Sequence, residues 1–265
     1  MSKVYTKIKE FLLGEGIEYF SAVKVEKLCV INERIMPENA KSCVLFFIPY
    51  YTGKHEDRNV SLYSVSLDYH LYIKELSAKF NGDGEHYFKF FADTSPINER
   101  RAAIDACLGF VGQNGLLFSE KYGSYIFVGT LLTDAVFDED EYAAGGEMKS
   151  CKNCGLCKKS CAYLKGERDY CLSELSQRKN VTDEELGVIR SQKLVWGCDI
   201  CQEVCPHNKD VEITPIEFFH RGLIEKIDAD MIENMSKDEF SKRAYAWRGK
   251  KTLLRNLGVD KLQDL

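Results

Sequence analysis

The chain of 265 residues lacks several features that would each place it in a particular class of protein. No apolar stretch approaches the roughly eighteen residues expected of a membrane-spanning helix, and the first residues have no apolar core of the kind found in secretory signals. No repeat with a period of roughly 20 to 50 residues is present, which argues against solenoids and propellers. We therefore expect a protein without a membrane span that resides in the cytoplasm.

The chain also lacks an excess of positive charge. The 36 Lys and Arg residues are outnumbered by 41 Asp and Glu residues, so the formal net charge is −5. This balance excludes a protein that binds nucleic acid through a basic overall surface. Hydrophobic residues make up 45% of the chain, which is enough for a substantial core in one or two domains.

Cysteine, by contrast, is concentrated, because eight of the eleven cysteines lie between residues 151 and 205. The run Cys151–Cys161 has the spacing C-x2-C-x2-C-x3-C, in which three thiolates hold one iron–sulfur cluster and the fourth reaches to another. Cys171 and the run Cys198-Asp-Ile-Cys201-Gln-Glu-Val-Cys205-Pro206 complete the set. The interleaved rule assigns the thiolates to two groups of four: Cys151, Cys154, Cys157 and Cys205, and Cys161, Cys171, Cys198 and Cys201. The spacing thus predicts two [4Fe-4S] clusters that transfer single electrons.

Zinc is the main alternative for these thiols, because C-x2-C pairs also build tetrahedral zinc sites. Spacings of three, three and four residues followed by a separate Cys-Pro fit zinc poorly. A disulfide framework is less favoured still, since the chain is too long to need such crosslinks. The alternative function that goes with zinc is RNA binding through the basic segment near the C-terminus.

The spacing of apolar residues predicts a mixed N-terminal part with helices and strands. Helical patterns occur at residues 2–13, at residues 65–80, and from Ser95-Pro96 to near Gly109. The unbroken apolar run 43–48 predicts a strand that is covered on both faces. Residues 115–119 and 125–132 are expected to pair as strands around a turn at residues 122–124.

An acidic stretch and two glycines, Gly145 and Gly146, interrupt the apolar pattern just before the first cluster cysteine, so we place a domain boundary there. The predicted domains are residues 1–145, 146–215 and 216–265. A capping box at Thr182 predicts a helix between Cys171 and Cys198, which explains the wide gap between these two cysteines. Residues 241–259 carry six basic and no acidic residues, which indicates either a phosphate-binding face or an amphipathic helix with its leucines on the body.

Several short motifs, taken with the cysteines, resemble those of the epoxyqueuosine reductase family. They are Asp68-Tyr-His70, Asp93-Thr-Ser-Pro-Ile-Asn-Glu99, Gly109-Phe-Val-Gly112-Gln-Asn114, Gly197–Asn208 and Arg248–Asn256. The resemblance spans roughly residues 40 to 257 and is specific as a combined pattern. The chain departs from the family at Gln113, where Lys is usual, and at Ala162, where Pro is usual. It resembles a short form, without the C-terminal helical repeats of longer members.

The resemblance implies an α+β architecture: an N-terminal α/β domain of cobalamin-binding type (1–145), as in the related reductive dehalogenases, then a two-cluster ferredoxin-like domain and a short helical tail. It implies that the clusters feed electrons to cobalamin for reduction of the epoxide of epoxyqueuosine in tRNA to the alkene of queuosine. Asp93 is then the proton donor, and Gly109, Gly112 and Asn114 contact the cofactor. The expected partners are tRNA or a queuosine-related nucleoside and a low-potential electron donor, with the protein as a monomer.

Two further functions stay open at this point. The chain could be a two-cluster electron-transfer protein that serves a partner enzyme, or a reductase of a different small substrate. The missing helical repeats, which help to hold tRNA in longer members, motivate both alternatives. Asp93 also has a purely structural interpretation, because Asp-Thr-Ser-Pro is an ordinary turn before a helix.

Overall fold

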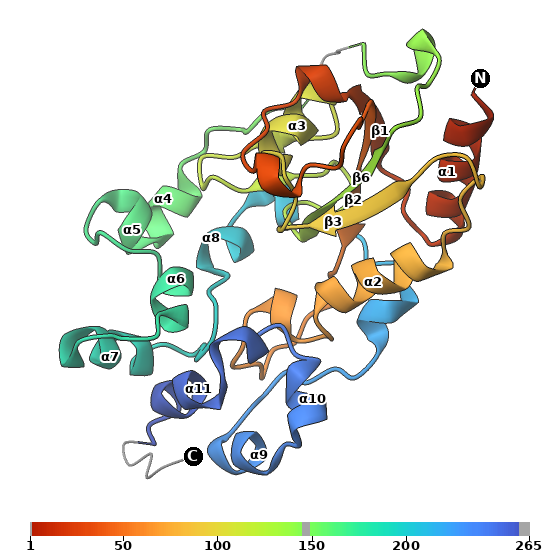
Figure 1. Cartoon of the computed structure of the whole chain (residues 1–265). Coiled ribbons are helices and arrows are strands. Elements are labelled where there is room, and N and C mark those ends of the chain that lie inside the picture. Colours follow the sequence, from red (N-terminus) through yellow and green to blue (C-terminus); the bar gives the residue numbers. More distant parts are fainter. Residues whose placement is uncertain (1, 145–148, 260–265) are drawn as a thin grey trace. The chain divides into compact units, whose positions relative to one another are not determined.

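The computed structural model describes residues 2–144 and 149–259 (Figure 1). The chain forms two compact units, each built from separate stretches of sequence. The first, called here the sheet unit, comprises residues 1–50, 70–153 and 210–216, and the second, the cysteine unit, comprises residues 51–69, 154–209 and 217–265. None of the helices in the described part of the chain has the length and apolar character that crossing a bilayer would require.

The sheet unit is built on one antiparallel sheet of four strands in the order β1–β2–β6–β3. Its strands are β1 (Phe20–Lys24), β2 (Ser42–Pro49), β3 (Phe88–Ala92) and β6 (Ile126–Thr133). Two short strands, β4 (Phe110–Val111) and β5 (Leu117–Phe118), form a separate hairpin. The helices are α1 (Lys3–Gly14), α2 (Tyr69–Lys79) and α3 (Glu99–Asp105). The sequence-based expectation of a mixed helix and strand fold is confirmed at this level.

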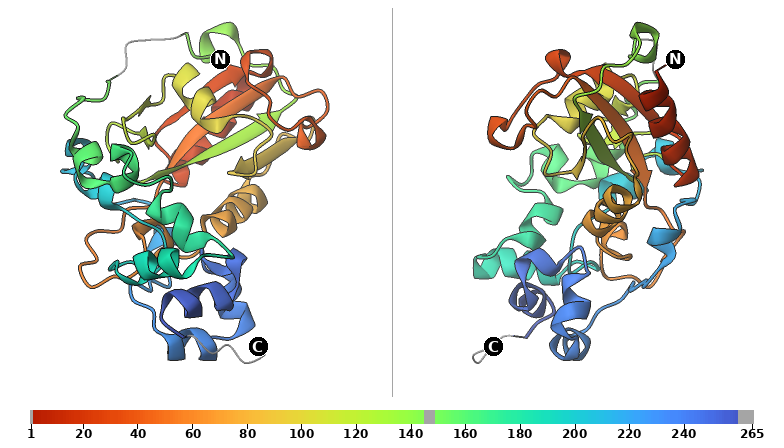
Figure 2. Two further views of the ribbon diagram at one scale, coloured as in Figure 1. Left: turned by 90° about the vertical axis from the view of Figure 1, so that its left-hand side faces the viewer. Right: turned by 45° about the vertical axis from the view of Figure 1, so that its right-hand side comes forward.

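Strand β2 lies at the centre of the core, and all of its residues are buried. Because successive side chains of a strand alternate between faces, Cys43 and Leu45 pack on one face with Ala102 of α3. Phe46 points to the opposite face, where its ring contacts Phe90, and helix α1 packs there. Figure 2 shows α1 and α3 on opposite sides of the sheet. The predicted strand at 43–48, covered on both faces, is confirmed.

The helix predictions have mixed outcomes. The helix expected at residues 2–13 is confirmed as α1. The helix start expected at Ser95-Pro96 is wrong, because α3 begins only at Glu99. Asn98 caps it, since its side-chain oxygen accepts the N–H of Arg101 at 3.1 Å. Ser95 and Pro96 are buried in the loop before this cap.

The predicted pairing of residues 115–119 with 125–132 is also wrong. Strand β5 pairs with β4 instead, and β6 is inserted between β2 and β3. The reason is a tight turn between β4 and β5, in which the N–H of Gly115 donates to the carbonyl of Gly112 at 2.9 Å. Gly115 has a φ of +76°, a left-handed conformation that glycine adopts without strain.

The cysteine unit consists of short helices joined by turns. They are α4 (Leu156–Ser160), α5 (Ala162–Lys165), α6 (Leu172–Gln177), α7 (Asp183–Arg190), α8 (Ile200–Glu203), α9 (Ala229–Asn234), α10 (Lys237–Ser241) and α11 (Lys250–Asn256). The capping box predicted at Thr182 is confirmed, because its side chain accepts the N–H of Glu185 and starts α7. Trp196 and Tyr245 lie at the centre of the apolar core that holds α9, α10 and α11 together.

Residues 51–69 belong to the cysteine unit although the sequence placed them in the N-terminal domain. Their backbone pairs with the segment before α8: Ser61 donates to the carbonyl of Trp196 at 2.8 Å, and Val195 donates to the carbonyl of Asn59 at 2.8 Å. The predicted domains at 1–145, 146–215 and 216–265 are continuous, whereas both observed units are discontinuous. The boundary between residues 145 and 146 itself lies outside the described residues.

The basic segment 241–259 follows the amphipathic-helix alternative. Leu253 and Leu254 of α11 are fully buried. Arg243 is buried and donates to two backbone carbonyls, and Lys250 and Arg255 likewise bond carbonyls of the same unit. Three of the six cations therefore bond backbone carbonyls of the described part of the chain.

Candidate metal centre and catalytic carboxyl

The cysteines of the predicted clusters are carried by short helices and the turns beside them. Cys157 lies in α4, Cys171 is the N-cap residue of α6, and Cys201 lies in α8. Gly155, with a φ of +72°, lets the chain turn between Cys154 and Cys157.

Three thiols of the second predicted group lie close enough to influence one another. Burial raises the pKa of Cys198 to about 11, the N–H of Ile200 opposes the rise, and the neighbouring thiols of Cys171 and Cys161 add to it. These three residues come from separate turns of the cysteine unit. A thiol in such surroundings keeps its proton unless a cation stabilises the thiolate, so a metal bound here would have to displace that proton.

The thiols do not surround a single ion. Within residues 2–144 and 149–259, no three Cys, His, Asp or Glu side chains converge on a point that could hold one metal ion. Around one zinc ion each sulfur would lie about 2.3 Å from the metal. A cluster of several irons binds each thiolate through a different iron, so convergence of this kind is no requirement for it.

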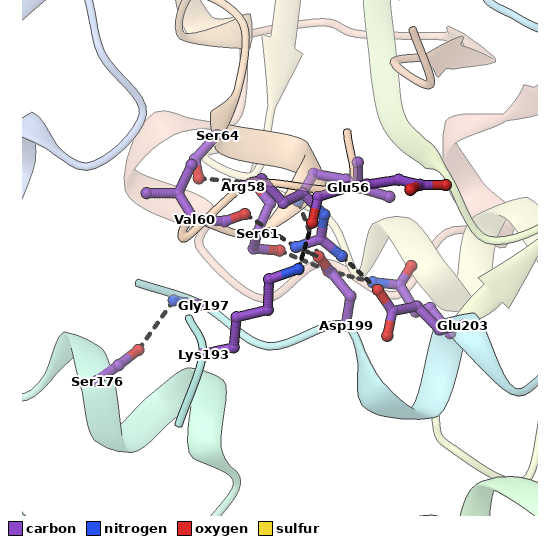
Figure 3. A network of polar contacts seen from close by, with 12 residues as sticks. Glu56, Arg58, Val60, Ser61, Ser64, Ser176, Lys193, Gly197, Asp199 and Glu203 are labelled. Atoms are coloured by element: carbon purple, nitrogen blue, oxygen red, sulfur yellow. Dashed lines mark hydrogen bonds and ion pairs between the residues drawn. The ribbon is translucent and has the colours of Figure 1, made fainter. Parts of the chain in front are cut away.

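A polar network fixes the turn between Cys198 and Cys201, and Figure 3 shows it. Asp199 is fully buried. Its carboxylate accepts hydrogen bonds from the hydroxyl of Ser61 at 2.5 Å and the N–H of Leu62 at 2.8 Å. Burial raises the pKa of Asp199. The charge of Arg58 and the hydrogen bonds from Ser61 and Leu62 oppose the rise, and the charge of Glu203 adds to it. The network anchors the cysteine turn to the segment 51–69.

Asp93, the predicted proton donor, lies in the loop between β3 and α3. It is exposed and has a left-handed backbone with a φ of +57°. Its N–H donates to Oε2 of Glu99 at 3.1 Å. An aspartate tolerates this conformation better than most residues, and the hydrogen bond to Glu99 helps to hold it.

Glu99 lies beside Asp93, and the sequence analysis assigned it no role. The residue is half-buried. Its Oε1 is buried and has no hydrogen-bond partner among the described residues. Burial raises the pKa of Glu99 to about 8, the negative charge of Asp93 adds to the rise, and the N–H of Asp93 opposes it. At neutral pH Glu99 therefore keeps its proton beside the Asp93 loop. The glutamate of the Asp93-Thr-Ser-Pro-Ile-Asn-Glu99 motif was the available signal.

The predicted cofactor contacts lie in the hairpin of β4 and β5, where the glycines have internal roles. A Cβ at Gly109 would lie 2.2 Å from the carbonyl oxygen of Phe118. A Cβ at Gly112 would lie 2.6 Å from the Phe118 ring and 2.8 Å from Oδ1 of Asn114. Asn114 accepts the N–H of Leu116 at 3.3 Å within the same turn. Packing of the hairpin thus accounts for these glycines, and contact with a cofactor stays a prediction.

The mixed fold and the cysteine unit define the class of the protein: a two-unit protein with one unit built on a sheet and the other rich in cysteine. No family model matches the chain. An epoxyqueuosine reductase of Lactococcus garvieae is 31% identical over 261 residues, which cover 86% of this chain and 71% of the relative. The chain belongs to the epoxyqueuosine reductase family.

Solved structures of this family share the fold. An epoxyqueuosine reductase from Streptococcus thermophilus matches with a TM-score of 0.70 and 22% identity, covering 97% of this chain and 80% of that protein. An epoxyqueuosine reductase crystallised with an epoxyqueuosine-modified stem loop of tRNA-Tyr matches with a TM-score of 0.72 and 20% identity, covering 96% and 80%. At these identities the likeness supports the fold alone.

Proposed function

We propose that this chain reduces the epoxide of epoxyqueuosine in tRNA to the alkene of queuosine. The observation that carries the proposal is the relationship to the Lactococcus garvieae reductase over 86% of the chain. A related reductase has been solved with an epoxyqueuosine-modified tRNA stem loop, which supports tRNA as the substrate here. A low-potential electron donor, a monomeric state and a cytoplasmic location complete the proposal.

Two [4Fe-4S] clusters are the proposed electron carriers. The donor set fits, because eight thiols form two groups of four at ferredoxin-like spacing. Cys151, Cys154, Cys157 and Cys205 would hold one cluster, and Cys161, Cys171, Cys198 and Cys201 the other. The electrostatic influence of Cys161 and Cys171 on Cys198 supports the second group.

Cobalamin is the proposed cofactor of the sheet unit. When bound, it supplies the reductive chemistry that no protein side chain provides. The hairpin glycines Gly109 and Gly112 have packing roles of their own, so the proposal for cobalamin, with these residues and Asn114 as contacts, depends on family membership.

Removing an epoxide oxygen consumes two electrons and two protons and yields an alkene and water. The opening C–O bond leaves negative charge on oxygen, and a positioned acid lowers the barrier by protonating it. Asp93 is the proposed acid, because its exposed side chain can reach a substrate and its backbone is held by Glu99. Glu99 keeps its own proton at neutral pH, which limits negative charge beside Asp93.

The test compares Asp93→Asn with wild-type protein after anaerobic reconstitution with iron, sulfide and cobalamin. Asparagine adopts the left-handed backbone as readily as aspartate but is no acid, so turnover of epoxyqueuosine-containing tRNA should fall by roughly 10²- to 10⁴-fold. Asp140→Asn, a change at an exposed aspartate of the same unit, is the control and should keep full turnover. Iron content and unfolding should match wild type in both variants.

The outcomes separate the alternatives. Unchanged turnover in Asp93→Asn would remove Asp93 from the reaction. Wild-type protein with roughly eight irons per chain but no affinity for cobalamin would favour an electron-transfer protein. Turnover of a free nucleoside but not of tRNA would indicate a different substrate, and zinc in place of iron would overturn the redox function.

A further inference from the structure

Arg58 lies in the cysteine unit and contacts two carboxylates with one guanidinium group (Figure 3). Its Nη1 lies 2.9 Å from Oδ2 of Asp199, and its Nη2 lies 2.5 Å from Oε1 of Glu203. Nη1 also donates to the carbonyl of Val60 at 2.9 Å. The side chain of Arg58 is only 6% exposed and that of Asp199 is 1% exposed, whereas Glu203 is 55% exposed.

The two carboxylates occupy particular places in the cysteine sequence. Asp199 lies between Cys198 and Cys201, which are predicted ligands of one cluster. Glu203 lies between Cys201 and Cys205, and Cys205 is a predicted ligand of the other cluster. Arg58 therefore joins the ligand segments of both clusters through a single cation.

A gain in folding stability is a weak explanation for the buried ion pair of Arg58 and Asp199. Removing two charges from water carries a large desolvation penalty, and replacing a buried ion pair by apolar residues is often neutral or stabilising. A buried charge does, however, act on a nearby redox centre, because the reduction potential of a cluster depends on net charge, hydrogen bonding and solvent exposure around it. The negative charge of Asp199 disfavours adding an electron, and the positive charge of Arg58 offsets it.

We propose that Arg58 is a positioning residue that sets the reduction potential of the clusters, by compensating the carboxylates of Asp199 and Glu203 and by holding the turn of α8. The inference depends on the proposed function, since it requires that the eight thiols bind iron. The effect is larger for the cluster bound by Cys198 and Cys201, because Asp199 is buried, whereas water screens Glu203.

The test is a potentiometric titration, followed by electron paramagnetic resonance, of anaerobically reconstituted full-length protein. In Arg58→Gln the buried carboxylate loses its cation, so the potential of at least one cluster should fall by an amount that changes its reduced-to-oxidised ratio tenfold or more, which is about 59 mV for one electron. In Arg58→Lys the charge is kept, so the potential should stay close to wild type. Arg34→Gln, at an exposed arginine of the sheet unit, is the control for a loss of one positive charge.

A double variant separates charge from geometry. Arg58→Gln combined with Asp199→Asn removes both charges, so its potential should return toward the wild-type value if compensation is the cause. A potential unchanged in Arg58→Gln, at full iron content, would overturn the inference and reduce Arg58 to a structural role. If Arg58→Gln binds no iron, Arg58→Lys with a strongly lowered potential would equally overturn it. Wild-type protein that binds no iron would instead overturn the proposed function.

Discussion

The buried carboxyl of Glu99 should make the stability of the sheet unit depend on pH. Burial and the charge of Asp93 raise the pKa of Glu99 from 4.5 to about 8. Between these values the native protein binds more protons than the unfolded chain, so stability falls as pH rises. The contribution is fully present below about pH 4.5 and is lost once pH has passed the folded pKa.

The size of the effect follows from the shift. One pKa unit corresponds to about 1.4 kcal/mol, so the whole rise is worth about 5 kcal/mol at most, and stability should fall by about 2 kcal/mol between pH 6 and pH 8. The titratable groups that face Glu99 are Asp93 and the thiol of Cys43. Burial raises the pKa of Cys43, so this thiol stays neutral across the window and adds nothing.

Glu99→Gln is the perturbation, because glutamine can still accept the N–H of Asp93 but carries no titratable proton. Hydrogen exchange of the β2 amides, measured in wild type and variant at each pH, gives the free energy of opening of the sheet unit. Relative to Glu99→Gln, the free energy of opening of wild type should fall by about 2 kcal/mol from pH 6 to pH 8, and the slope near pH 8 should be about half of that near pH 6. Glu38→Gln, at an exposed glutamate, should give a flat difference. If the difference in free energy of opening between wild type and Glu99→Gln does not change with pH, or changes in the opposite direction, the carboxyl of Glu99 does not keep its proton at neutral pH.

Two glycine substitutions test packing in the two units. In Gly129→Ala the new Cβ would lie 2.2 Å from the ring of Phe46 in the neighbouring strand, so unfolding in urea should show a loss of about 1–3 kcal/mol; a loss below about 0.5 kcal/mol would contradict this packing. In Gly197→Ala the Cβ would lie 2.4 Å from that of Ser61 and the φ of +72° would be strained, so the reconstituted protein should retain less iron. Gly187→Ala, with no atom near the new Cβ, should keep both stability and iron and is the control.

Local patterns in the sequence were sufficient for elements that local physics decides. The unbroken apolar run at β2 predicted a strand covered on both faces, and the cap at Thr182 predicted the start of α7. In both cases the decisive contacts are close in sequence or follow from burial alone. The interpretation of the cysteine spacing as two clusters stays a prediction.

Partner choice between strands was beyond the sequence. Residues 115–119 and 125–132 have strand patterns and a turn between them, which favours a hairpin. The observed partner of β6 is β2, which precedes it by about eighty residues and offers a fully buried surface. A pattern of alternation or apolarity carries no information about such a distant partner.

The site shows the same limit. The sequence singled out Asp93 and the eight cysteines by residue type and motif, but it gave Glu99 and Arg58 no role. A glutamate and an arginine are usually solvated, and only the tertiary structure reveals that Oε1 of Glu99 and the side chain of Arg58 are buried. Glu99 lies beneath the loop of Asp93 through one hydrogen bond, and Arg58 meets Asp199 across 141 positions of sequence.

The discontinuous units explain why these buried groups escape a linear interpretation. Segment 51–69 brings Arg58 and Ser61 to the cysteine turn from the N-terminal half of the chain, and segment 210–216 supplies Thr214, whose hydroxyl donates to the carbonyl of Pro49 in the sheet unit at 2.7 Å. A continuous piece that ended near residue 145 would lack Thr214 and would leave Arg58 without either carboxylate. Arg58, the cation that we propose sets the reduction potential of the clusters, therefore comes from a segment that the sequence alone assigns to the N-terminal domain.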